Sequence, residues 1–174
     1  NEHIDAIWMA LNASYGLEAI RFLCSFAVSF GFAENGIFMG NGNIISLIMQ
    51  DELLHMEWTA YLINQVVKDD PRFAEAKIRN EDRVYQLYTE VIQEEYDWAD
   101  YLFHKGVVVG LNSTILKSFI NHMATTRLKN IGLKWKTPVK INPLPWFSKH
   151  MNISRKQVSL QEQESTNYII GALT

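Results

Sequence analysis

Glu52 and His55 are three residues apart in IISLIMQDELLHMEWTAYLINQVV, a segment that otherwise has the pattern of a long apolar-faced helix. Side chains at i and i+3 are neighbours on one helix face, with Cβ atoms about 5–6 Å apart. A carboxylate and an imidazole at this spacing can bind one metal ion together. A third candidate ligand, Glu18, interrupts the still more apolar segment LNASYGLEAIRFLCSFAVSF. Because buried charges are costly unless paired or metal-bound, the three residues favour a metal site.

Less specific explanations exist for the same residues. Glu-x-x-His is also common as a surface pair or around a satisfied core histidine, and Glu18 could form a salt bridge with Arg21 at i+3. Asp100 and His104, at i and i+4, could chelate a metal as well. We prefer a helix-end interpretation for that pair, since a histidine near a helix C-terminus interacts favourably with the dipole. On a helical wheel Glu18 and Glu52 share the apolar faces of their helices, which favours the metal hypothesis.

The ligands require helices that place them against each other. A Glu-x-x-His helix facing a glutamate-bearing helix is half of the ligand set of dinuclear carboxylate bundles. The periodicity predicts four long helices over about 4–33, 43–68, 71–106 and 112–132. Turn and capping signals separate them, namely Asn35-Gly36, Asp69-Asp70-Pro71 and Asn112-Ser113. The predicted fold is all-α.

Beyond Gly132 the helical periodicity stops, and three of the four prolines follow. We therefore predict two parts: a long-helix half-bundle carrying part of a dinuclear site over residues 1–132, and an irregular C-terminal segment and tail over 133–174. The chain begins at Asn1 within a helical pattern. We interpret it as part of a longer domain, with a missing N-terminal half that completes the bundle.

Composition sets broad limits on function. The 174 residues are 48% hydrophobic and 20% charged, with a net charge of −3, which is ordinary for a soluble globular protein and gives no reason to expect nucleic acid or an anionic membrane as partner. The basic stretch 127–140 is interpreted as a solvated loop. The uncharged run 22–33 is too short to cross a bilayer, the first 35 residues lack a signal-peptide pattern, and the lone Cys24 fits a reducing cytoplasm.

Several motifs occur in a fixed order along the chain. They are LEAIRF at 17–22, SFAVSFGFAE at 25–34, GNGNIISLIMQDELLH at 40–55, DWADYLFHKGVVVGLN at 97–112, NPLPW at 142–146 and ESTNYIIG at 164–171. In order and spacing they resemble the second half of the small, radical-generating subunit of class I ribonucleotide reductase. The resemblance covers nearly the whole chain and implies a ferritin-like helical bundle.

The resemblance also implies roles for residues near the metal site. Glu18, Glu52 and His55 match three metal ligands of the family, which holds two iron ions, with manganese or a mixed iron–manganese pair as the other options. Asp51 matches the aspartate that links the metal site to the radical-transfer route, and outer carboxylates of this kind orient ligand histidines.

Further roles concern the radical. Phe22, Phe26 and Ile48 match the apolar pocket around the family's stable tyrosyl radical. Tyr168 matches the tail tyrosine that relays the radical to the large subunit, and Glu162 falls at the family's tail glutamate, although its surroundings match less well.

The chain departs from the family pattern in what it contains. It has three of the six expected ligands, one Glu-x-x-His step and no match to the radical tyrosine, and Gln50 stands where many relatives have a basic residue. The implied activity, ribonucleoside-diphosphate reduction, therefore requires the N-terminal half, the large subunit and pairing into a homodimer in the cytoplasm. Two alternatives stay open: another dinuclear carboxylate oxidase, such as a desaturase or a hydroxylase component, and a non-catalytic remnant that only pairs with a partner subunit.

Overall fold

The structure, a computed structural model, describes residues 2–151. These residues form six α-helices and one short 3-10 helix. In chain order they are α1 Glu2–Ala19, α2 Leu23–Glu34, α3 Met39–Asp69, α4 Pro71–Arg79, α5 Glu81–Leu102, α6 Ser113–Asn130 and the 3-10 helix η1 Pro145–Lys149. The fold over these residues is all-α, as predicted.

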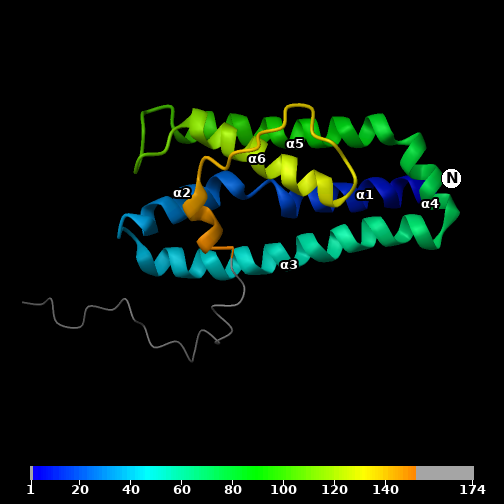
Figure 1. Cartoon of the computed structure of the whole chain (residues 1–174), viewed down its shortest axis with the longest axis horizontal. Coiled ribbons are helices and arrows are strands. Elements are labelled where there is room, and N and C mark those ends of the chain that lie inside the picture. Colours follow the sequence, from blue (N-terminus) through cyan, green and yellow to red (C-terminus); the bar gives the residue numbers. More distant parts are fainter. Residues whose placement is uncertain (1, 152–174) are drawn as a thin grey trace, which may run out of the picture.

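The helices form an elongated bundle with α1 and α2 at its centre (Figure 1). The long helix α3 packs along one side of α1 and α2, while α5 and α6 pack against each other on the opposite side. α1 and α2 contact helices on both sides, because α1 also packs on α5 and α2 on both α5 and α6. The central helices are therefore the most apolar part of the bundle.

The predicted first helix, 4–33, is wrong in one respect: it is interrupted at residues 20–22, which separate α1 from α2. The predicted third helix is also two helices, divided at Asn80. The buried side-chain amide of Asn80 donates to the backbone carbonyl of Ala76 at 2.9 Å. A side chain therefore binds one of the carbonyl groups in the last turn of α4. Smaller corrections are that α3 begins at Met39 and α5 ends at Leu102.

The sequence predicted one helix start at about Pro71 and another just after Asn112, and the structure confirms both. Asp70 accepts a hydrogen bond from the backbone N–H of Arg72 at 2.9 Å, and Pro71 is the first residue of α4. Asn112 accepts from the backbone N–H of Ile115 at 2.9 Å. Each side chain satisfies a backbone donor that the first helical turn leaves unpaired.

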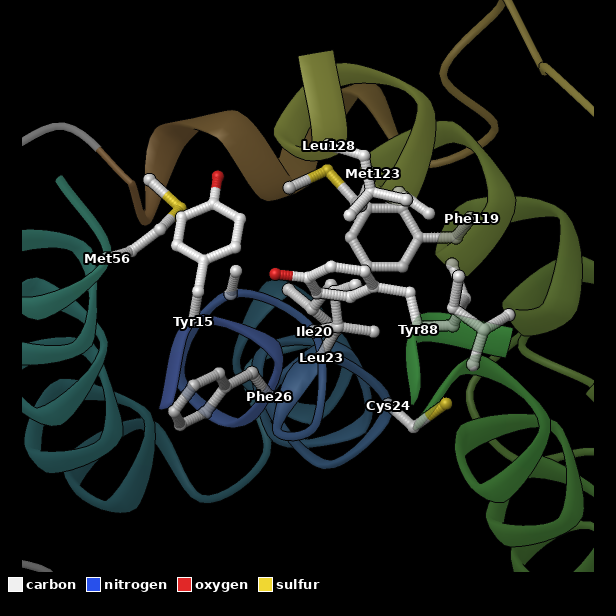
Figure 2. Close-up of a cluster of buried hydrophobic side chains, with 14 of the residues drawn as sticks. Tyr15, Ile20, Leu23, Cys24, Phe26, Met56, Tyr88, Phe119, Met123 and Leu128 are labelled. Atoms are coloured by element: carbon white, nitrogen blue, oxygen red, sulfur yellow. The ribbon is translucent and has the colours of Figure 1, made fainter. Parts of the chain in front are cut away.

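Buried tyrosines connect the central helix to the far side of the bundle. Tyr15 on α1 donates to the backbone carbonyl of Arg127 on α6 at 2.7 Å, and Tyr88 on α5 donates to the carbonyl of Asn12 at 3.1 Å. Figure 2 shows the two rings within the core cluster, in an edge-to-face arrangement with centroids 6.4 Å apart. Burial raises the pKa of Tyr15 to about 12, so its hydroxyl remains a donor at neutral pH.

Residues 131–144 contain no helix and lead back across the bundle to η1. The buried ring of Phe147 packs on Phe119 of α6 and Phe30 of α2, with centroids 4.7 and 5.5 Å away. Lys149 forms an ion pair with Glu34 at 2.8 Å. η1 is thus attached to the end of α2. The predicted tail residues Tyr168 and Glu162 lie outside the described residues.

Residues 2–34 are together long and apolar enough to pass for a membrane span by length and composition. Half of their most apolar window is buried inside the bundle. The central position of α1 and α2 accounts for this composition, because a helix packed on several sides is apolar around much of its circumference.

A close approach of α2 and α3 gives a first prediction. A Cβ atom on Gly42 would lie 2.6 Å from the Cβ of Ala33. Gly42→Ala is therefore expected to lower the free energy of unfolding by about 1–3 kcal/mol, measured by urea denaturation. Gly40→Ala in the same helix is the control. Nothing lies within 4 Å of its Cβ position, so it should leave stability unchanged or raise it; equal losses in both variants would contradict the packing explanation.

Candidate metal centre

Glu18 is positioned by contacts between α1 and α3. Its carboxylate, half-buried near the end of α1, accepts a hydrogen bond from the Thr59 hydroxyl on α3 at 2.9 Å and a longer one from Ser14 at 3.4 Å. These bonds hold the carboxylate against α3 and away from the apolar centre of the bundle.

Glu52 and His55 lie on α3 as the sequence predicted. The Oε2 atom of Glu52 is 3.8 Å from Nδ1 of His55, so the two side chains point to a common space. The carboxylate is half-buried and the imidazole is exposed. This arrangement suits two donors that share one ion from one helix face.

Thr59 connects the two halves of the candidate centre. It follows His55 by four residues, about one helical turn, and Glu52 by seven, so all three lie on one stripe of α3. Because Thr59 binds Glu18, the structure brings Glu18 to within about a turn of the Glu52–His55 step. Within residues 2–151, however, no three His, Cys, Asp or Glu side chains form a ready metal site. The three residues as metal ligands remain a prediction.

The predicted radical-pocket residues are only partly assembled. The rings of Phe22 and Phe26 are neighbours, with centroids 6.0 Å apart, and Phe26 is buried. Phe22 is more exposed than Phe26, and Ile48 on α3 is 43% exposed. Asp51 is exposed next to Glu52. The pocket therefore has an open side in this chain.

The alternative partner for Glu18 is not observed. Arg21 forms its ion pair with Glu94 of α5. The other acid–histidine pair is engaged separately: Asp100 binds Lys117 at 2.6 Å, and Nδ1 of His104 contacts the carbonyl oxygen of Tyr101 at 2.6 Å just beyond the end of α5. That placement of His104 agrees with the helix-end interpretation.

Two buried charged residues that bind the backbone where α1 and α2 meet were missed by sequence reasoning. Glu95 of α5 is 3% exposed, and its carboxylate accepts from the backbone N–H of Cys24 at 2.9 Å. Burial raises the pKa of Glu95 to about 7. Arg127 of α6 is 4% exposed and donates to the carbonyl of Ala19, and burial lowers its pKa to about 10. Glu95 continues the buried stripe of α5 three residues after Ile92, so the pattern that singled out Glu18 was also present here.

Exposed apolar residues follow the same face of α3 as the candidate ligand. Ile44, Ile48 and Trp58 lie on one stripe with Asp51 and His55, at helical spacings of four, seven, eleven and fourteen from the first. Trp58 is 60% exposed. We call Ile44, Ile48 and Trp58 the α3 apolar stripe. A tryptophan and two isoleucines flanking a carboxylate–imidazole pair indicate a face that packs against other helices.

An all-α bundle with a glutamate on one helix held against a Glu-x-x-His helix is typical of ferritin-like carboxylate bundles. Comparison with known proteins agrees with this class. The family model described as ribonucleotide reductase, small chain, matches residues 2–143. This chain belongs to the ribonucleotide reductase small chain family.

Individual relatives are similar over nearly the whole chain. Ribonucleoside-diphosphate reductase 1 subunit beta of Escherichia coli O157:H7 is 37% identical over 96% of this chain and 45% of its own length. Ribonucleoside-diphosphate reductase subunit beta of Enterobacteria phage T4 is 34% identical over 98% of this chain and 45% of its own. The chain thus spans about half the length of the curated relatives it matches.

A solved structure gives the same fold. The ribonucleotide reductase R2 subunit from Clostridium botulinum superimposes with a TM-score of 0.73, at 24% sequence identity, over 83% of this chain and 45% of that one. The bundle described here is therefore an R2-like, ferritin-like bundle that is partial relative to its homologues.

Proposed function

We propose that this chain is the C-terminal part of a ribonucleoside-diphosphate reductase small subunit and provides three of the six ligands of its dinuclear metal site. The observation that carries the proposal is the Thr59–Glu18 hydrogen bond, which brings Glu18 close to the Glu52–His55 step on the next helix. Membership in the small chain family supports it.

The donors fit the metals of such a site. Glu18 and Glu52 offer carboxylate oxygens and His55 an imidazole nitrogen, a set that suits iron or manganese. Two iron ions, when bound, would supply the activation of O2 that forms a protein radical. In this chain, Thr59 binds the Glu18 carboxylate, and the rings of Phe22 and Phe26 would help to exclude water from the site once its open side is covered.

The remaining ligands come, in this proposal, from helices that these 174 residues do not include, encoded upstream or as a separate polypeptide. We call them the complementing helices. The α3 apolar stripe is the surface that they would cover, because it carries exposed Ile48 and Trp58 on both sides of the candidate ligand His55. Their packing would also close the open side of the pocket formed by Phe22 and Phe26.

The complete subunit would act in the cytoplasm, as a homodimer bound to the large subunit. Asp51, adjacent to Glu52 and exposed on α3, would begin the radical-transfer route. Glu162 and Tyr168 would continue it towards the large subunit, where ribonucleotides become deoxyribonucleotides.

Metal content of the complex with the complementing helices tests the proposal. Glu18→Ala, Glu52→Ala and His55→Ala should each reduce the iron content of the complex to half the wild-type value or less, because each removes a ligand from a two-ion site. Iron is measured by elemental analysis after anaerobic loading, and the radical by electron paramagnetic resonance.

The control is the second acid–histidine pair. Asp100→Asn and His104→Ala remove residues at a comparable spacing that bind Lys117 and the Tyr101 carbonyl, and they should leave the iron content unchanged. If Glu52→Ala keeps the wild-type iron content, Glu52 is not a metal ligand. The chain would then be a non-catalytic remnant that only pairs with a partner subunit.

A further inference from the structure

The interruption between α1 and α2 leaves backbone groups without their usual helical partners. In a continuous helix, the N–H of residue i bonds to the carbonyl of residue i−4. Here the N–H of Leu23 bonds instead to the carbonyl of Ile20, three residues back, at 3.2 Å. The Ala19 carbonyl and the Cys24 N–H are thereby freed from the helical ladder at the two edges of the break.

Both freed groups are bound by buried charged side chains from the other side of the bundle. Glu95 of α5 accepts from the Cys24 N–H at 2.9 Å, and Nη1 of Arg127 of α6 donates to the Ala19 carbonyl. The two side chains belong to different helices and bind opposite edges of the same three-residue interruption.

Burying these charges is costly, which argues that the arrangement is a specific feature of the fold. A buried ion without a close counter-ion loses its hydration and is retained only where hydrogen bonds compensate. Nη2 of Arg127 has no hydrogen-bond partner among residues 2–151. Cys24, whose backbone N–H binds the Glu95 carboxylate, belongs to the buried apolar cluster shown in Figure 2.

The break lies between two groups of candidate functional residues. Glu18 immediately precedes Ala19, Phe22 is the last residue of the interruption, and Phe26 lies in the first turn of α2. In an uninterrupted helix Glu18 and Phe22 would lie at i and i+4, stacked on one face. Residues 20–22 have turn rather than helical geometry, and this turn sets the direction of the Glu18 carboxylate relative to the two rings.

We propose that Glu95 and Arg127 are positioning residues that hold the break between α1 and α2 and thereby fix the orientation of Glu18 for metal binding. This inference rests on the proposed function. Neither residue touches the candidate ligands, so both act through the backbone of residues 19–24.

The first measurement is hydrogen exchange in the full chain at pH 7. Glu95→Leu removes the acceptor and Arg127→Met removes the donor. Loss of this buried hydrogen bond should speed exchange of the Cys24 amide about tenfold in Glu95→Leu. Glu95→Gln keeps an acceptor oxygen and should retain the protection. Asp97→Asn, which removes an exposed carboxylate of α5 that accepts from the Gln93 side-chain amide at 2.8 Å, is the matched control and should exchange like the wild type.

The second measurement is the visible absorption spectrum of Co(II) bound to the complex with the complementing helices. Glu95→Leu and Arg127→Met should shift the ligand-field bands while Asp97→Asn does not, and Glu95→Gln should give the wild-type bands. A residue that only stabilises the fold would lower the melting temperature without moving these bands. If Glu95→Leu does not fold, Glu95→Asp, whose shorter side chain withdraws the carboxylate from Cys24, is measured in the same two ways.

The outcomes separate the two proposals. Unchanged exchange at Cys24 in Glu95→Leu overturns the role of Glu95 in holding the break. Faster exchange with an unchanged Co(II) spectrum, in a complex where Glu18→Ala loses metal, overturns the positioning role and leaves the proposed function intact. If Glu18→Ala itself retains all its metal, the proposed function fails, and the positioning role fails with it.

Discussion

Trp58→Asp is expected to weaken the association of this chain with the complementing helices by about 30- to 1,000-fold, the range for a tryptophan at the centre of an interface. Trp58 is exposed on α3 one turn beyond His55, so the substitution puts a charge where apolar packing is expected. The same exposure means that the chain's own fold should tolerate the change. Association is measured by titration of the two purified polypeptides, and folding by circular dichroism.

The control for Trp58→Asp is Ile78→Asp on α4. Ile78 is 77% exposed but belongs to a different helix from the α3 apolar stripe. It should leave the association constant within about threefold of the wild type, as expected for a surface position outside an interface. Wild-type association of Trp58→Asp, or an equal loss in both variants, would show that the stripe is not the contact surface.

Glu95 should make the stability of the chain fall as pH rises from about 4.5 to 7. Its pKa is raised to about 7 by burial, against 4.5 for an ordinary glutamate. Between these values the folded state binds a proton that the unfolded state has lost, so the free energy of unfolding decreases with pH. The full difference corresponds to about 3 kcal/mol. Arg21 and Cys24 oppose the shift and Glu94 adds to it, but burial dominates.

The measurement compares Glu95→Gln with the wild type in urea denaturation at pH 5 and pH 8. Glutamine remains neutral, so the two proteins should have similar stability at pH 5, and Glu95→Gln should be more stable by about 3 kcal/mol at pH 8. Other titrating groups cancel in this difference. Asp97→Asn, an exposed position on the same helix, should follow the wild-type pH dependence. A constant difference between Glu95→Gln and wild type at both pH values would contradict the raised pKa.

The metal candidates were predictable because their signal is local. Glu52 and His55 are within one helical turn, and periodicity alone places them on one face of α3. The apolar neighbours of Glu18 marked it as an unusual carboxylate in the same way. The contact between Glu18 and Thr59 was not predictable at this level, since it depends on how α1 and α3 align, and the two residues are 41 positions apart in the sequence.

The interruption of the first helix could not be seen from nearby residues. Residues 20–22 are Ile-Arg-Phe, without proline or glycine, and the apolar pattern continues through them. The side chains of Glu95 and Arg127 hold the break. They are 71 and 108 positions away in the sequence from the residues whose backbone they bind. Asn80 is the contrasting case, because one buried amide ends α4 by a contact only four residues away.

Cys24, beside the break, can report the separation of α2 from α5 through the reactivity of its thiol. Its thiol is fully buried and donates to the Glu95 carbonyl at 3.4 Å, and burial raises the thiol pKa, so the reactive thiolate is suppressed in the native state. It is the single cysteine of the sequence. The rate at which a thiol reagent modifies the unaltered protein therefore measures how often α2 separates from α5. No engineered label is needed.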